Sequence, residues 1–223
     1  MKALFTSLIL FLSLVTLEAS DQYKAEIVPS KMSIETKKER FFHLVVPAIK
    51  RVHTELIKEY YIVKSDMKLG KNRAKIKQLK KTYRAKTDKE LLLALKPHPQ
   101  SIVIAQAILE SGWATSRFFV KAKNIFGMWS FNENEPRIAA SEKRDGKKTI
   151  WLRKFSTIEE SVREYYKLMG RSGVFKKFRN VRYKTKDVPT IIKTLDKYAE
   201  TGQIYLQQLN ELIQYNDLTR YDI

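Results

Sequence analysis

The chain has 223 residues and carries 43 lysines and arginines against 24 aspartates and glutamates, which gives a formal net charge of +19. Hydrophobic residues make up 43% of it, with only seven glycines and six prolines, so the composition excludes wholesale disorder and suits one domain with a helical extension. The absence of cysteine excludes disulfides, thiol chemistry and thiolate metal sites, and the three histidines lack ligand-like spacing, so we expect neither a metal nor an organic cofactor.

The first 20 residues predict a secretory signal peptide. Lys2 precedes an apolar run over residues 3–17, which ends in the small residues Ala19 and Ser20. The run is too short for a comfortable membrane span of about 20 residues, although an uncleaved anchor is the alternative. We therefore expect signal-peptide residues 1–20 and an exported protein. Its positive charge would then meet anionic wall or envelope polymers and not nucleic acid, which would be the first candidate in a cytoplasmic protein.

Residues 21–96 predict a helical N-terminal extension. Apolar residues at three-to-four spacing indicate a helix over 36–67, in which Pro47 should start or kink a helix. Residues 71–86 are rich in lysine and arginine with a thin apolar stripe, which is typical of a solvated amphipathic helix. A short helix over 89–95 follows before the chain reaches two prolines.

Residues 97–223 form the predicted main domain, and its first helix is the most informative. Residues 102–109 are apolar except for Gln106, and a helix that is apolar all round is buried on all sides. This helix should end at Glu110, with Gly112 placed to terminate it.

The middle of the main domain predicts a small β-lobe, and the rest predicts helices. Residues 132–154 are polar, with Asp145-Gly146 as a hairpin-type turn and residues 149–152 as a strand. Helical periodicity covers residues 157–169, 188–198 and 204–215. The total is mainly α.

Glu110 has the position of a catalytic acid. The carbonyl dipoles at the end of its helix disfavour a negative charge, and burial raises the pKa of a carboxyl group in the same way. A carboxylic acid that stays protonated near neutral pH is what cleavage of a glycosidic bond requires. The position alone does not decide between this interpretation and the alternative, in which Glu110 is an exposed residue that enters solvent where the helix ends.

The sequence around Glu110 favours the catalytic interpretation. The stretch AQAILESGWATSRF at 105–118, followed by KNIFG at 123–127, closely resembles the AQAALESGWGTS…NNLFG signature of the peptidoglycan glucosaminidases. These enzymes form glycoside hydrolase family 73 in the lysozyme-like superfamily, and the Bax-like proteins look most similar. The resemblance covers roughly residues 36–223 and implies a mainly α, lysozyme-like helical domain with a small β-lobe and a helical N-terminal extension. Ala114, where the family usually has Gly, and Lys123, where it often has Asn, depart from the pattern without removing a carboxylate.

The resemblance also implies the catalytic residues. Glu110 matches the family's catalytic acid, and Glu142 lies in a segment similar to the family's Thr-Glu-Tyr-x-x-Gly hairpin, which makes it the candidate base that activates water. Lys143 replaces the tyrosine of that hairpin, so the match is weaker there. An ordinary exposed hairpin carboxylate is the alternative for Glu142, and Glu133 and Glu135 are lesser candidates.

Five further residues are candidates for the sugar groove. Tyr198 resembles the tyrosine of the family's Tyr-Ala-Thr segment, although a core tyrosine at a helix end is the alternative. Aromatic residues should line the groove, because apolar sugar faces stack on aromatic rings. Trp113 and Phe126 are expected in the core or on the floor of this groove. Gln106 precedes the acid by one helical turn and so should orient it, and Asn124 should fix the loop backbone.

The sequence therefore predicts an endo-β-N-acetylglucosaminidase that hydrolyses β-1,4 bonds in peptidoglycan glycan strands, works as a monomer and resides in the periplasm or envelope of a bacterium. The mechanism is open between inversion with a water molecule and attack by the 2-acetamido group of the substrate. A lytic transglycosylase and a non-catalytic wall-binding protein are the alternative functions.

Overall fold

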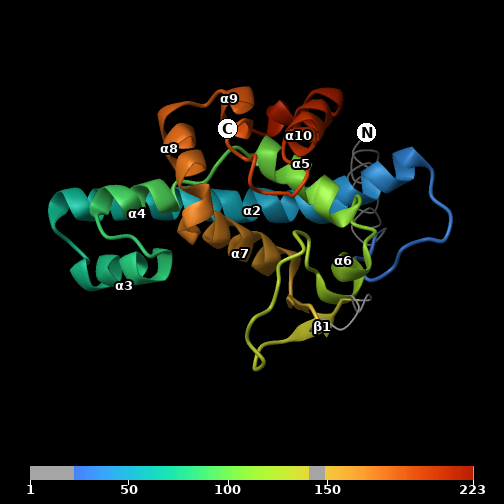
Figure 1. The fold of residues 1–223 in the computed structure, drawn as a ribbon, viewed down its shortest axis with the longest axis horizontal. Helices are drawn as coiled ribbons and strands as arrows, with labels where there is room; N and C mark the ends of the chain where they lie inside the picture. The colour runs from blue at the N-terminus through green and yellow to red at the C-terminus, as the bar shows by residue number, and fades with distance from the viewer. Residues whose placement is uncertain (1–22, 141–148, 223) are drawn as a thin grey trace, which may run out of the picture.

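The computed structural model describes residues 23–140 and 149–222, and the described part is mainly helical with one small sheet, as predicted (Figure 1). The predicted signal peptide and the Asp145-Gly146 turn lie outside the described residues. Among the described residues, no helix is both long and apolar enough to cross a membrane.

A 36-residue helix, α2 (Ile34–Leu69), runs through the molecule and confirms the helix predicted over 36–67 (Figure 1). The Ser33 side chain accepts a hydrogen bond from the backbone N–H of Thr36 and so caps its start, while Gly70, with a φ of 65°, ends it. Pro47 lies inside this helix, so the expectation that a helix starts there is wrong. The residues on both sides of Pro47 are buried in the core, and this packing holds the helix through the proline.

Two short helices, α3 (Arg73–Tyr83) and α4 (Asp88–Leu95), lie beside one end of α2 (Figure 1). Together with α2 they enclose a separate apolar cluster of five buried residues: Tyr60, Val63, Ile76, Leu91 and Leu95. Thr87 caps α4 by accepting a hydrogen bond from the backbone N–H of Glu90.

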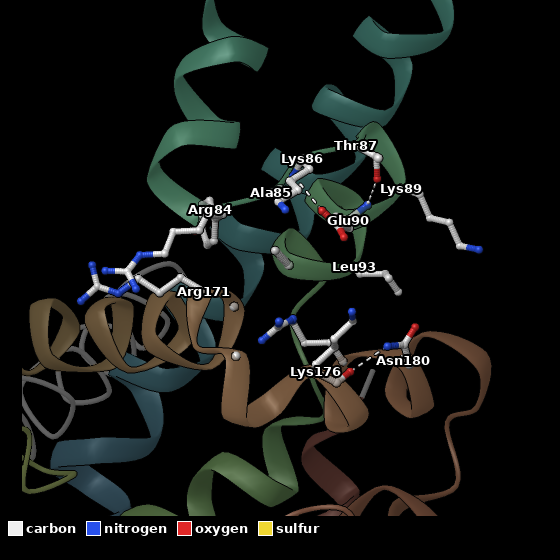
Figure 2. A pocket seen from close by; sticks show the side chains of 15 residues that line it. Arg84, Ala85, Lys86, Thr87, Lys89, Glu90, Leu93, Arg171, Lys176 and Asn180 are labelled. Atoms are coloured by element: carbon white, nitrogen blue, oxygen red, sulfur yellow. Dashed lines mark hydrogen bonds between the residues drawn. The ribbon is translucent and has the colours of Figure 1, made fainter.

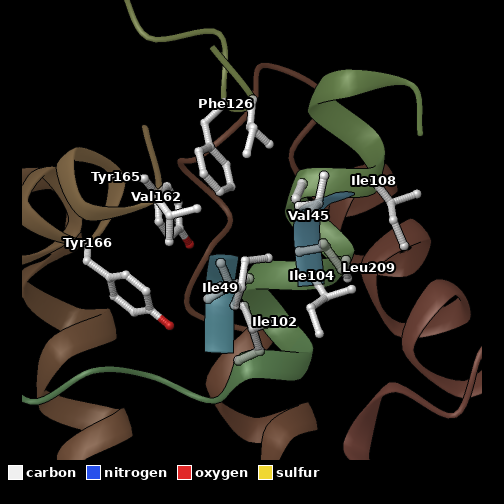
Figure 3. Packing of buried hydrophobic residues seen from close by; sticks show 14 of the residues in the cluster. Val45, Ile49, Ile102, Ile104, Ile108, Phe126, Val162, Tyr165, Tyr166 and Leu209 are labelled. Atoms are coloured by element: carbon white, nitrogen blue, oxygen red, sulfur yellow. The ribbon is translucent and has the colours of Figure 1, made fainter. Parts of the chain in front are cut away.

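The helix α5 (Gln100–Ser111) is buried along its length up to Ile108, which confirms the all-round apolar pattern. It packs against α2, and Figure 3 shows Val45 and Ile49 of α2 in the same cluster as Ile102 and Ile104 of α5. Helices α2 and α5 therefore share one core, which also receives apolar residues of the later helices.

The small β-lobe consists of two antiparallel strands, β1 (Arg137–Ala139) and β2 (Trp151–Arg153). The strand predicted over 149–152 thus begins two residues late, at Trp151. A six-residue helix, α6 (Arg117–Ala122), was not predicted and lies between α5 and this lobe in sequence.

The remaining helices cover the core. They are α7 (Ile158–Arg171), the 3-10 turn η1 (Gly173–Phe175), α8 (Lys176–Lys184), α9 (Val188–Ile192), α10 (Gln203–Tyr215) and η2 (Leu218–Tyr221). The helices predicted from 157 and 204 are confirmed, whereas α8 was not predicted. The helix predicted over 188–198 is too long, because the backbone after Ile192 tightens into three-residue turns in which Thr194 and Leu195 donate to Ile191 and Ile192.

Candidate active site

A cavity of about 420 Å³ opens at the C-terminal end of α5, where Glu110 lies. It is bounded by the loop after α6, by β2, by the second half of α7 and by the segment before α10. We call this cavity the cleft. Five aromatic side chains line it: Phe126, Trp129, Phe131, Phe175 and Tyr198. Such a wall provides flat apolar surfaces on which a sugar ring stacks.

Glu110 is half-buried in the last turn of α5, which ends because Gly112 adopts a left-handed conformation with a φ of 56°. Burial raises the pKa of the Glu110 carboxyl, and the hydrogen bond from the Tyr205 hydroxyl acts in the opposite direction without cancelling it. That hydroxyl donates to Oε1 of Glu110 over 3.3 Å. Among the described residues, no group hydrogen-bonds Oε2, so this oxygen is left for a ligand.

Glu110 is the end of a buried chain of hydrogen bonds. The Tyr205 hydroxyl accepts from Nε2 of Gln106 over 2.9 Å, and Oε1 of Gln106 accepts from the Tyr165 hydroxyl. The Tyr165 oxygen lies 2.8 Å from Nε2 of His98. Because the Tyr165 hydroxyl proton is already given to Gln106, His98 is the donor in this last bond.

In this series of hydrogen bonds, each group donates to the next one in the direction of Glu110. Complete burial lowers the pKa of His98 well below its ordinary value, so His98 is neutral and carries its proton on Nε2. The tyrosine rings are held by stacking: Phe126 on Tyr165 with 4.0 Å between ring centroids, and Tyr198 on Tyr205 with 5.3 Å. Figure 3 shows Phe126 and Tyr165 near each other within the core cluster. This series of hydrogen bonds therefore holds the Tyr205 hydroxyl rigidly in place as the donor to Oε1 of Glu110.

A second carboxylate, Glu164 of α7, also lines the cleft. Burial alone would raise its pKa, but hydrogen bonds from Arg153 (2.8 Å) and Lys167 (3.1 Å) outweigh burial and hold the pKa below its usual range. Arg153 also donates to Glu135 over 3.1 Å, so it ties β2 to both carboxylates. Sequence reasoning missed Glu164, because one glutamate on a strongly amphipathic helix has the pattern of a surface residue.

The structure brings together only some of the predicted site residues. Phe126 and Tyr198 line the cleft with Glu110, whereas Gln106 is fully buried and reaches Glu110 only through Tyr205. Asn124 holds the loop, since its Nδ2 donates to the carbonyls of residues 128 and 153 and its Oδ1 accepts from the N–H of residue 128. Glu142 lies outside the described residues.

Trp113 is directed to a different cavity, of about 850 Å³, which Lys38 and Tyr215 also line. The cause lies in the backbone, because Gly112, Trp113 and Ala114 all have positive φ values (56°, 62° and 60°) and turn the chain sharply. A positive φ at residue 114 is easiest for glycine, which gives a physical reason for the glycine usual at this place in the signature.

Tyr205, Tyr165 and His98 are the other residues that sequence reasoning missed. Tyr205 lies on α10, Tyr165 on α7 and His98 in the loop before α5, and no local spacing connects them with Glu110. Among the described residues, no group of three or more histidines, aspartates and glutamates is placed to hold a metal ion.

Comparisons with known proteins identify the family of the chain. The family model for glucosaminidase (mannosyl-glycoprotein endo-beta-N-acetylglucosaminidase) matches residues 85–218. The chain is 35% identical over 130 residues to the exo-glucosaminidase LytG of Bacillus subtilis (strain 168), a match that covers 55% of this chain and 45% of LytG, so the chain spans less than half of that relative. It is 25% identical over 201 residues to Protein bax of Escherichia coli (strain K12), with 81% and 70% of the two chains covered.

A solved structure supports the fold. The catalytic domain of the autolysin Auto from Listeria monocytogenes superposes with a TM-score of 0.55 at 20% sequence identity, and the match covers 95% of this chain and 97% of that domain. At this identity the likeness concerns the fold, and it confirms the expected mainly α, lysozyme-like architecture.

Proposed function

The chain belongs to the glucosaminidase family, and from this premise we propose that it is an endo-β-N-acetylglucosaminidase that hydrolyses β-1,4 bonds in the glycan strands of bacterial peptidoglycan. One observation carries the proposal: Glu110 is a half-buried carboxyl group with a raised pKa, at the edge of a cleft with an aromatic wall. A carboxyl group whose pKa is raised, beside a surface that stacks sugars, is the arrangement that glycosidic cleavage uses.

In the proposed reaction, Glu110 gives its proton to the glycosidic oxygen as the bond from that oxygen to the anomeric carbon breaks. The leaving sugar departs with a hydroxyl group, and Glu110 is left as a carboxylate. Oε2 is the oxygen that faces the substrate, because Oε1 is held by Tyr205. The Tyr205 hydrogen bond strengthens when Glu110 becomes negative, so it stabilises the transition state more than the ground state.

A water molecule then attacks the anomeric carbon, and its proton passes to a base. The family resemblance makes Glu142 the candidate for this base, and attack by the 2-acetamido group of the substrate is the alternative. We do not assign the base to Glu164, because two cationic side chains hold its carboxylate and keep it from taking a proton. Glu164 and Arg153 instead serve to fasten the β-lobe to α7.

Product analysis tests the proposal. Purified sacculi are digested with the protein, and the released muropeptides are identified by mass spectrometry. Hydrolysis gives reducing N-acetylglucosamine ends, which we expect. Anhydro-muramyl ends would identify a lytic transglycosylase instead, and binding without any released glycan would identify a wall-binding protein. Release of long fragments together with short ones distinguishes the proposed endo cleavage from exo cleavage.

The substrate also determines the proposed location. Peptidoglycan lies outside the cytoplasm, so the protein must be exported to the periplasm or cell envelope to reach it. The net charge of +19 suits that surrounding, because wall and envelope polymers are anionic. Cell fractionation tests this proposal: we expect the protein in the envelope or periplasmic fraction, and its recovery in the cytoplasm would contradict export.

A further inference from the structure

A cavity of about 640 Å³ lies between the loop that leads into α4 and the ends of α7 and α8. Figure 2 shows side chains from the two walls facing each other across it. We call it the basic pocket, because six cationic side chains line it: Arg84, Lys86, Lys89, Arg171, Lys176 and Arg179. Glu90 is the one carboxylate among its described lining residues.

The positive charge of the basic pocket is only partly offset within the described part of the chain, because Glu90 is the one carboxylate beside six cations. None of the six cations forms an ion pair with a carboxylate there. The carboxylate of Glu90 already accepts a hydrogen bond from the backbone N–H of Lys86 over 2.7 Å. Arg84 from one wall and Arg171 from the other extend to the same side of the pocket (Figure 2). A pocket lined by more cations than carboxylates attracts anions.

A further buried cation lies behind one wall. Arg182 is only 4% exposed, and its Nη2 donates to the carbonyl of Leu93 (2.7 Å) and to that of Ala94 (3.3 Å), two residues that line the basic pocket. Its Nε and Nη1 have no hydrogen-bond partner among the described residues. Burial, reinforced by the charge of Arg179, lowers the pKa of Arg182 to about 9, so it is still charged at neutral pH.

The basic pocket adjoins the cleft. Arg171, at the end of α7, lines both cavities. Leu168, one turn earlier on the same helix, lines the cleft, and Lys176 at the start of α8 lines the pocket. Because the two cavities share Arg171, a group attached to a glycan strand in the cleft would have the basic pocket beside it.

We propose that the basic pocket binds the carboxylates of the stem peptide that is attached to the glycan strand being cut. This inference rests on the proposed function. Stem peptides hang from alternate sugars of peptidoglycan and carry free carboxylates, and arginine and lysine bind carboxylates through charge-assisted hydrogen bonds. The volume of the pocket, about 640 Å³, is in the range of cavities that bind small ligands.

The test compares two charge-matched variants. The triple variant Arg84→Gln/Lys86→Gln/Lys176→Gln removes three exposed cations from the basic pocket and leaves the cleft intact. The control Lys50→Gln/Lys58→Gln/Lys193→Gln removes three exposed cations that line neither cavity.

Each protein is assayed on four soluble glycan oligomers: one that carries stem peptides, one whose stem carboxylates are amidated, one without peptides, and one without peptides that carries phosphate polymer. We expect the pocket variant to lose about 10-fold in kcat/KM, mostly through KM, on the peptide-bearing oligomer only. The control should stay within about twofold of the wild type, and about 0.5 M salt should shrink the loss.

The results that differ from this expectation distinguish a wrong pocket assignment from a wrong proposed function. Wild-type kcat/KM on every oligomer, or an equal loss on the amidated or bare oligomer, would overturn the pocket assignment and leave the proposed function standing. A loss on a peptide-free oligomer that carries phosphate polymer, with none on the peptide-bearing one, would replace the carboxylates by wall phosphates. A wild-type protein that cleaves none of the oligomers would refute the proposed function itself. The double variant Lys86→Gln/Lys176→Gln should show a smaller loss with the same preference among substrates, which provides the test if the triple variant does not fold.

Discussion

Replacing Tyr205 by phenylalanine removes one hydroxyl group from the hydrogen-bond chain that ends on Glu110. The ring and its stacking on Tyr198 remain, but Nε2 of Gln106 loses its acceptor in a fully buried position. A buried donor left without a partner costs about 1–3 kcal/mol, so the free energy of unfolding should fall by about that amount. Loss of the donor also leaves Glu110 less well oriented, and kcat at the optimum pH should fall about 10-fold.

The pH dependence separates a role in catalysis from a purely structural one. The Tyr205 hydroxyl stabilises the ionised form of Glu110 and so lowers its pKa, which means that its removal raises the pKa further. Because the acid must be protonated to act, activity is lost as pH rises through this pKa, and the alkaline limb of the kcat profile should move to higher pH in Tyr205→Phe.

The assay measures initial rates of reducing-end formation on peptide-free glycan across the pH range, together with urea unfolding. Tyr60→Phe is the control, since Tyr60 is buried in the separate cluster of α2, α3 and α4. It should lose stability with no shift of the alkaline limb. An alkaline limb in Tyr205→Phe that stays in place or moves to lower pH would refute the reasoning, whatever happens to stability.

Three further predictions concern the scaffold. Arg40 is buried and donates to four backbone carbonyls, so Arg40→Leu should lower the free energy of unfolding by about 2–4 kcal/mol in urea titrations; a loss below about 1 kcal/mol would contradict this. In Gly170→Ala the new Cβ would lie 2.8 Å from the Tyr83 ring and 2.9 Å from the Ala94 carbonyl, so calorimetry should show a destabilisation of about 1–3 kcal/mol and not the gain usual for alanine in a helix. In nitrogen-15 NMR, His98 should remain neutral with its proton on Nε2, and a titration near the ordinary 6.5 would disprove this assignment.

The features that the sequence predicted correctly are those encoded locally. The run of apolar residues in α5 required burial on all sides, and Gly112 fixed where the helix ends. The place of Glu110 at that end followed from these two facts, whereas its burial stayed open until the structure showed a half-buried carboxyl group with a raised pKa. The periodicity of α2, α7 and α10 was similarly clear, because each buries one face against the core.

The features that could not be predicted depend on contacts between distant segments. Pro47 predicts a helix start by local rules, yet the buried residues around it keep α2 continuous. Glu164 acquires its place in the cleft only because α7 folds against the β-lobe. The series of hydrogen bonds from His98 to Tyr205 joins residues that are up to 107 positions apart in the sequence. These bonds form only when α5, α7 and α10 pack together.

Trp113 was expected in the core or on the floor of the sugar groove. It packs against the core but does not line the cleft. Three consecutive left-handed residues, which no hydrophobic pattern reveals, turn the chain so that the indole joins the other cavity with Lys38.

The most direct test of the whole account is the activity of Glu110→Gln on peptide-free glycan, measured beside its stability. Glutamine has the same shape and still accepts the hydrogen bond from Tyr205, but it has no proton to donate. Burial raises the pKa of Glu110, so the carboxylate costs stability at pH values above its unfolded pKa, and the variant should be as stable as the wild type at neutral pH or more so. We predict that cleavage falls by about 10²–10⁴-fold in this folded variant. A folded Glu110→Gln protein that cleaves glycan at nearly the wild-type rate would contradict the assignment of Glu110 as the acid.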